Sequence, residues 1–486
     1  MPARPHVLIL ACAVLVGGCG VDHQGDPPPE GMLYFPNGVL LSPHAEGEPA
    51  RYLFVANTNF DLLYHSGSVQ AYDLDRLDAA IEACDTLGQD DCVIETVPDK
   101  HTDPTAEDAD PRTAGVLADE VLIGPYANGI TLGTRGDHLF VATRTDESLT
   151  VIGLDADAPA DVAGKADVLS CAERNKRCRR AAARGPDPDD SGYLQWAQDP
   201  VALAAGSLSD WAPDADGDYV VSAHLDGSVS LFVEAGSDEQ GEPLFTLTDV
   251  ERFYPGTLTG LAHDPLTNLI HVTSVNPRVL GRRLGRVGVA VPRREGEPDP
   301  LRASLYPVAE LRLEGTSVAN DARAIRFLEQ GVMEPNLRTL IVSREPSALL
   351  LADVSQEDNR GGFGSVRRTV TLGSGPSKLS VATLGEGDDV VRVAAVSCFD
   401  GREVFIVDLD TMFTRAVIPN LSGPFDLALD GARQKLYVTD FRTSVVRVID
   451  LSALTAPPIG DSSEEPVPAP RVIATLGRAQ AIQELR

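Results

Sequence analysis

The chain has 486 residues, 43% of them hydrophobic and 23% charged, a balance that supports a large buried core and excludes wholesale disorder. The 72 Asp and Glu residues outnumber the 41 Lys and Arg residues, and the resulting net charge of −31 excludes a general nucleic-acid binder. The 43 glycines and 35 prolines, many at turn positions, favour short strands over long helices.

The N-terminus is typical of an export signal. The apolar run Val7–Val16 is too short to span a bilayer but has the length of the apolar part of a secretory signal. It leads into Val16-Gly17-Gly18-Cys19, which resembles a bacterial lipobox, and that resemblance implies a lipidated cysteine as the first mature residue. The alternative is an ordinary signal peptide with a chance cysteine. We expect a signal peptide over 1–18, lipidation of Cys19 and a Pro-rich tether over 19–30.

This anchor predicts a place in the bacterial cell envelope. The strong negative charge disfavours anionic lipid surfaces, so we expect the lipid alone to hold the protein to the membrane. Gly20 is not the acidic retention residue of the enterobacterial type, which favours the outer over the inner membrane.

Cysteine spacing agrees with an oxidising compartment. Two close pairs, Cys84/Cys92 and Cys171/Cys178, are expected to form disulfides. Zinc is the competing interpretation, but neither pair has CxxC spacing or histidines nearby. Cys398 lies in an apolar strand, and we expect it to be a small, buried hydrophobic residue in place of a reactive thiol.

One pattern recurs through the rest of the chain: two apolar strands joined by a short turn. Its instances span 53–75, 139–155, 219–233, 270–291, 340–355, 393–410 and 436–452. Each follows a short apolar segment opened by Pro, Gly or Asn, and most precede a further strand. Seven such four-stranded units bury both faces of every sheet when stacked radially. The sequence therefore predicts an all-β fold, a seven-bladed β-propeller with four-stranded blades over 31–486.

The units LYVT (436–439) with VVRVIDL (445–451), and LFVAN (53–57) with SVQAYDL (68–74), resemble YVTN-type β-propeller repeats of bacterial surface and exported proteins. They are also similar to the repeats of lactonase-type propellers. The resemblance implies blades and no particular chemistry.

Long insertions are expected in blades 1, 2 and 4, at about 76–118, 156–192 and 292–307. Placed between third and fourth strands, all three would project on one face of the disc and stand outside the packed core. The second carries a dense basic run that consists of Arg174, Lys176, Arg177, Arg179 and Arg180. This run is either a solvated helical loop or a patch that binds a partner or polyanion.

Aligning the first strands of the units predicts a ring of residues around the axis: Asn37, Asn128, Pro200, Thr259, Arg323, Lys378 and Asp426. A solvated channel mouth is one interpretation of this mostly polar set. In the other, Arg323 and Lys378 hold an anion while Asn37, Asn128 and Asp426 supply oxygen atoms. Calcium-dependent gluconolactonases use a similar set of axial ligands, but one carboxylate would hold a divalent ion weakly. The set therefore favours carboxylate or phosphate binding over metal catalysis.

The sequence contains no GxSxG, HExxH, CxxCH or P-loop motif. Asp214-Ala-Asp216-Gly-Asp218 resembles the opening of a calcium loop, but Leu225 stands where the twelfth, acidic position belongs. We expect no cofactor and no resident metal.

The preferred function is a binding or protein-interaction module whose partner is a cell-envelope protein or a small anionic ligand. The alternative is a lactonase-like metal-assisted hydrolase with its site in the central channel.

Overall fold

The structure is a computed structural model, and the residues that it describes exclude the predicted signal peptide, Cys19 and the basic run. They are 26–45, 47–86, 92–98, 110–144, 149–161, 163–171, 178, 194, 196–237, 243–280, 283–294, 296–314, 319–355, 363–385, 387, 390–455 and 469–480. Among them, no helix is both long enough and apolar enough to cross a membrane.

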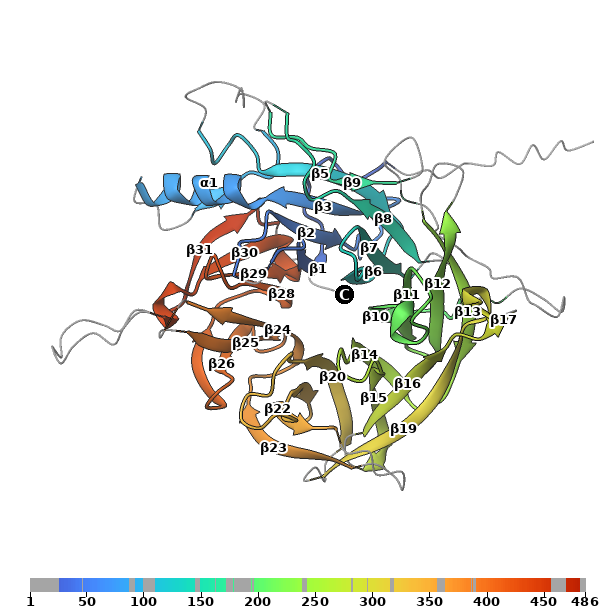
Figure 1. Cartoon of the computed structure of the whole chain (residues 1–486). Helices are drawn as coiled ribbons and strands as arrows, with labels where there is room; N and C mark the ends of the chain where they lie inside the picture. The colour runs from blue at the N-terminus through green and yellow to red at the C-terminus, as the bar shows by residue number, and fades with distance from the viewer. Residues whose placement is uncertain are drawn as a thin grey trace, which may run out of the picture.

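Nearly all the regular structure is β-strand, in sheets whose strands mostly follow chain order (Figure 1). The first sheets are β1 (Pro36–Leu41), β2 (Tyr52–Asn57), β3 (Gly67–Asp73) and β5 (Leu117–Ile123); β6 (Ala127–Leu132), β7 (His138–Thr143), β8 (Thr150–Leu154) and β9 (Leu169–Ser170); and β10 (Pro200–Ser207), β11 (Asp218–His224), β12 (Val229–Ser237) and β13 (Pro243–Glu251).

The second half of the chain begins with one large sheet. Its eight strands are β14 (Thr257–His263), β15 (Ile270–Leu280), β16 (Arg283–Ala290), β19 (Ser304–Glu314), β20 (Ala319–Phe327), β21 (Thr339–Arg344), β22 (Ser347–Asp353) and β23 (Phe363–Thr371). The last sheets are β24 (Pro376–Leu384), β25 (Val391–Cys398), β26 (Glu403–Asp408) and β27 (Phe413–Ile418); and β28 (Pro424–Asp430), β29 (Lys435–Asp440), β30 (Val445–Asp450), β31 (Arg471–Leu476) and β4 (Val93–Ile94). Within the third predicted insertion, β17 (Arg293–Arg294) pairs with β18 (Glu297–Pro298).

Seven strands line the axis of the molecule: β1, β6, β10, β14, β20, β24 and β28. Each contacts the next, and β28 contacts β1, so the seven form a closed ring (Figure 1). The predicted all-β, propeller-like architecture is confirmed. The large sheet differs from the predicted separate blades, because β15 pairs with β20 and β19 with β23.

The strands next to the ring are almost entirely buried. Every residue of β2, β7 and β11 is buried, because neighbouring sheets cover both of their faces. This double burial explains why the repeats contain continuous apolar runs such as LFVA, in place of the alternation typical of a half-exposed sheet.

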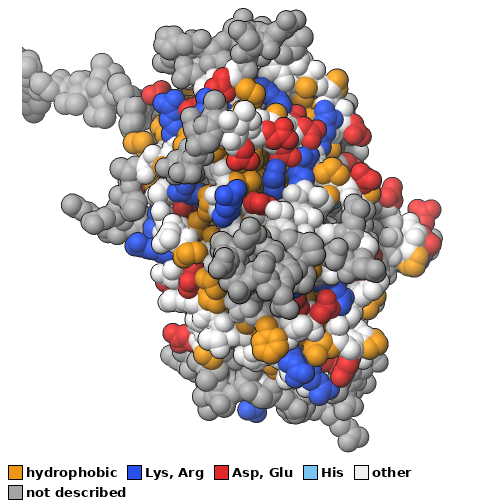
Figure 2. Space-filling view, turned by 90° about the vertical axis from the view of Figure 1, so that its left-hand side faces the viewer, with side chains coloured by type: hydrophobic (Ala, Val, Ile, Leu, Met, Phe, Trp, Pro, Cys, Tyr) orange, Lys and Arg blue, Asp and Glu red, His pale blue; other side chains and the backbone are white. Residues whose placement is uncertain are grey.

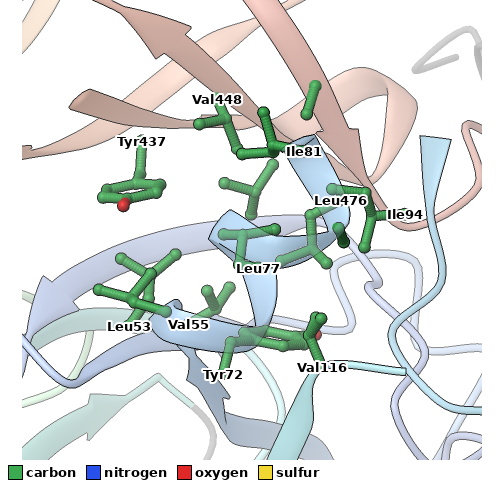
Figure 3. Packing of buried hydrophobic residues seen from close by; sticks show 14 of the residues in the cluster. Leu53, Val55, Tyr72, Leu77, Ile81, Ile94, Val116, Tyr437, Val448 and Leu476 are labelled. Carbon is green, nitrogen blue, oxygen red and sulfur yellow. The ribbon is translucent and has the colours of Figure 1, made fainter. Parts of the chain in front are cut away.

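The first predicted insertion contains the one α-helix among the described residues, α1 (Leu74–Thr86). The Asp73 carboxylate caps the helix by accepting the amides of Asp75 and Arg76, both at 3.0 Å. Leu77 and Ile81 on its buried face pack between the first and last sheets, beside Val448 and Leu476 (Figure 3). The expectation that this insertion stands outside the packed core was therefore wrong.

The same insertion also ties the first sheet to the last one. Strand β4, which comes from it, adds to the last sheet by pairing in parallel with β31. The amides of Thr475 and Gly477 donate to the carbonyls of Cys92 and Ile94, at 2.8 and 2.9 Å. Charged side chains support this contact, because Arg433 pairs with Asp75 and Asp78 of α1.

Both predicted disulfides are confirmed. Cys84 at the end of α1 is bonded to Cys92, with their Cα atoms 5.7 Å apart, and Cys171 to Cys178, at 5.2 Å. Cys398 is a buried free thiol, as predicted, and burial raises its pKa to about 12.

The second predicted insertion was placed wrongly in the chain. Strand β9 lies inside the range 156–192 and pairs with β8, so the fourth strand precedes most of this segment. The stretch from Cys171 to β10 therefore follows the fourth strand in the chain, whereas the prediction put it before that strand. Cys178 packs against the first and second sheets, and its amide donates to the carbonyl of Leu122 at 2.8 Å.

Figure 2 shows the side of the molecule on which α1 and the last sheet lie. Acidic and basic side chains intermingle there, with apolar ones scattered between them. The described surface on this side has no field of a single sign that would mark a polyelectrolyte partner.

Candidate functional site

The residues that the sequence predicts around the axis share one backbone feature: an irregularity in strand pairing near the start of each innermost strand. These irregularities fall between Pro36 and Gly38, Ala127 and Ile130, Pro200 and Ala202, Leu258 and Gly260, Ala322 and Ala324, Pro376 and Leu379, and Pro424 and Leu427. A bulged residue leaves the ladder and can aim its side chain in a new direction.

Six of the seven predicted residues lie within these irregularities: Asn37, Asn128, Thr259, Arg323, Lys378 and Asp426. The exception is Pro200, which keeps its pairing with His224, so that Val201 holds the equivalent position in β10. The alignment of β10 was wrong by one residue.

The uncharged members of this set join neighbouring innermost strands. Asn37 donates to the carbonyl of Ala127, and Asn128 donates to that of Pro200 at 3.2 Å. Thr259 likewise donates to the carbonyl of Ala322. Because these side chains are occupied by backbone carbonyls, their first role is to hold the ring together.

Asp426 makes the equivalent contact between β28 and β1. Its carboxylate accepts the amides of Val39, at 3.2 Å, and of Leu427, at 3.0 Å. Burial raises the pKa of Asp426, and the positive charges of Lys378 and Arg326, together with these amides, oppose the rise.

Arg323 does not match its predicted role as a free cation. Its Nε lies 2.6 Å from a carboxylate oxygen of Asp321, two residues earlier on the same strand. This ion pair neutralises the charge that the prediction assigned to an anionic ligand.

Arg326, on the same strand, was missed at the sequence level. Its side chain is exposed to solvent, yet burial lowers the pKa of its guanidinium while Asp426 opposes that change. Both the exposure of Arg326 and its lowered pKa are explained if the side chain projects into solvent that is enclosed by the ring of strands. Neither the Arg326 guanidinium nor the Lys378 ammonium has a hydrogen-bond or ion-pair partner among the described residues. An arginine within an innermost strand was the signal in the sequence.

An aromatic cluster lies at the end of the ring where the innermost strands begin. Phe35 and Phe425 flank Phe441, with ring centroids 5.1 and 6.0 Å away. Phe399 packs against the same ring at 6.3 Å and carries the Arg442 guanidinium over its face. These side chains place an apolar, partly exposed rim beside Lys378 and Asp426, since all lie at the same end of the strands.

The three acidic residues of the predicted calcium loop have separate partners. Asp214 pairs with Arg293 at 2.7 Å, Asp216 accepts the amide of Gly217, and Asp218 accepts the Thr134 amide. Within the described part of the chain, no group of three or more His, Cys, Asp or Glu side chains is placed to hold a metal ion.

A buried cluster around His224 has the residue types of a catalytic pair but no exposure. His224 Nε2 lies 2.8 Å from the Ser222 hydroxyl and 3.0 Å from that of Ser230, and all three residues are inaccessible to solvent. The Trp196 indole donates to Ser222 at 2.9 Å. This cluster therefore connects β11 and β12 to the segment before β10, and no substrate can reach it.

The same cluster predicts a loss of stability in acid. Burial lowers the pKa of His224 from 6.5 to about 4, so the unfolded chain takes up this proton at a higher pH than the folded protein. Stability should therefore fall by about 3 kcal/mol as the pH drops from 6.5 through 4. Denaturant unfolding at pH 7.5 and pH 5 measures this slope. His224→Gln should be less stable at pH 7.5 but should show a flatter slope, and an unchanged slope would contradict the assignment.

No family model matches this chain, and neither does any curated protein. Among solved structures, it is similar to hydrazine synthase of Kuenenia stuttgartiensis, with a TM-score of 0.39 and 13% sequence identity. The match covers 68% of this chain and 78% of that chain. A likeness of this extent carries no conclusion about activity.

Proposed function

We propose that this chain is a seven-bladed β-propeller of the YVTN type, exported and lipid-anchored at Cys19 to the bacterial outer membrane, and that it works as a binding module. The closed ring of seven innermost strands supports the blade count. The two disulfides agree with an oxidising, exported location. The basic run at 174–180 stays a predicted interaction patch and lies outside the described residues.

The ligand that the described residues fit best is a small carboxylate or phosphate within the ring. The observation that carries this proposal is Arg326, a solvent-exposed guanidinium on an innermost strand that has no side-chain partner among the described residues. Lys378 adds a second positive charge, and Asp426 is the carboxylate on which both act. In a protein of net charge −31, such a site would hold an anion by charge-assisted hydrogen bonds.

Calorimetry with inorganic phosphate and with succinate tests this proposal. We expect the wild type to bind at least one of them, and the Arg326→Ala, Lys378→Ala variant to bind at least about tenfold more weakly, because hydrogen bonds to charged groups contribute about 1.5–3 kcal/mol each. The matched control is Arg323→Gln, which removes a guanidinium that Asp321 already occupies and should change affinity little. Equal binding by wild type and double variant, or no binding by either, would contradict the site.

A further inference from the structure

The loop between β2 and β3 presents apolar side chains to solvent at the end of the ring where the innermost strands begin. Leu62 is 51% exposed, Leu63 65% and Phe60 37%. The inner edge of the Phe60 ring packs against Tyr126 and Phe441, at centroid distances of 5.7 and 5.6 Å. The loop is thus the outermost part of the aromatic cluster.

The loop's own hydrogen bonds hold these leucines outward. The Asn59 side chain accepts the amide of Tyr64 at 3.2 Å, and the Leu62 amide donates to the carbonyl of Asn59 at 3.1 Å. Leu62 has a φ of +56°, a left-handed conformation that is uncommon for leucine. A fixed and strained loop that keeps two leucines in water indicates an apolar contact made outside the described chain.

The one acidic side chain of the loop, Asp61, is exposed but is held by hydrogen bonds within the fold. The Asp61 carboxylate accepts the Tyr34 hydroxyl and the Leu63 amide, the latter at 3.1 Å. Its negative charge is therefore engaged by the loop and by the segment that leads into β1, while Leu62 and Leu63 form the tip.

The N-terminal tether reaches the fold at this same loop. The His65 amide donates to the carbonyl of Asp26, the first described residue, at 3.4 Å. Cys19 precedes Asp26 by seven residues, which span at most about 25 Å when fully extended. A lipid on Cys19 would therefore keep Asp26, which bonds to this loop, within that distance of the bilayer.

We propose that the tip of this loop, Phe60 with Leu62 and Leu63, rests in the bilayer interface and turns the end of the ring at which the innermost strands begin toward the membrane. The inference rests on the proposed anchor at Cys19 and goes beyond it, because the lipid is then not the protein's only membrane contact. Apolar side chains in this position are buried about 5–10 Å into the headgroup region. The occupant is a lipid surface.

Tryptophan quenching by brominated phosphatidylcholine tests the orientation. The full chain carrying Leu63→Trp is reconstituted by its own lipid into vesicles with and without brominated acyl chains. The matched control is Leu266→Trp, because Leu266 is 67% exposed on the β14–β15 turn, at the opposite end of the innermost strands. We expect bromine to roughly halve the emission of the tryptophan at 63, a depth consistent with interfacial burial, and to leave that at 266 unchanged.

Flotation of wild type and Cys19→Ser with the vesicles separates the two proposals. If the wild type floats, Cys19→Ser does not, and only the tryptophan at 63 is quenched, both proposals are supported. If the wild type floats but position 63 is not quenched, or both positions are quenched equally, the loop contact is wrong and the anchor stands. If the wild type does not float, both are wrong.

A dimer in detergent that Leu62→Ser, Leu63→Ser converts to monomer would show that a second copy covers the loop, and would also overturn the lipid contact.

Discussion

Removing the Cys84–Cys92 disulfide is expected to loosen the closure of the ring between its first and last sheets. Cys84 is 1% exposed and Cys92 3%, and both belong to the apolar cluster that α1 forms with β30 and β31 (Figure 3). The short loop between them sets the position of β4, whose parallel pairing with β31 joins residues far apart in sequence. We therefore expect the Cys84→Ala, Cys92→Ala variant to lose about 2–3 kcal/mol from the loop constraint alone.

Amide hydrogen exchange measures where this loss falls. The amides of Thr475 and Gly477, which donate to the carbonyls of Cys92 and Ile94, should lose protection first. Cys171→Ala, Cys178→Ala is the matched control, because these cysteines have a sequence separation of 7 against 8 and pack against the cluster of the first and second sheets. That variant should lose similar stability without exposing Thr475 or Gly477. Unchanged protection of these two amides after removal of Cys84 and Cys92 would contradict a role in closure.

The sequence predicts the inner part of the fold well, because the same pattern of burial recurs there in every unit. The strands beside the innermost ones are almost entirely buried by neighbouring sheets, so every unit carries a similar apolar run. The outermost strands lack this signal. Strand β9 has only two residues, and β27, with Phe413 74% exposed, has little apolar surface to bury.

Helix α1 was missed for a different reason. Its buried positions, Leu74, Leu77, Ala80, Ile81 and Cys84, follow a helical period that is visible in the sequence. The polar, Pro-rich composition of the whole insertion hid that period. Where the helix packs could not be inferred, because its partners in β30 and β31 lie more than three hundred residues later.

The ring of site residues was predictable by position but not by role. Equivalent spacing located the bulges of six innermost strands without any knowledge of their geometry. The partners of those side chains are backbone carbonyls and amides on the adjacent innermost strand, which spacing does not reveal. Arg326 escaped notice because no other innermost strand repeats an arginine at that position.

Arg338→Met is expected to cost about 3–5 kcal/mol of stability, because it would leave a buried carboxylate without its cation. The Arg338 guanidinium bonds to Asp264 at 2.8 Å, and the two side chains are 9% and 4% exposed. It also donates to the carbonyl of Leu328 at 2.9 Å. The bond therefore joins the turn after β14 to the turn after β20, on adjacent innermost strands.

Two further variants separate the ion pair from packing in denaturant unfolding. Arg344→Met removes an exposed pair with Asp400, whose side chains are 40% and 42% exposed, and should cost less than about 1 kcal/mol. Adding Asp264→Asn to Arg338→Met removes the orphaned charge and should restore part of the loss. Although burial favours the neutral acid, the hydrogen bonds from Arg338, Leu266 and Thr267 hold the pKa of Asp264 below its usual value. The wild type should therefore lose this stabilisation as the pH falls through that lowered pKa, whereas Arg338→Met should lose less. If Arg338→Met and Arg344→Met cost the same, burial does not strengthen this contact between the two turns.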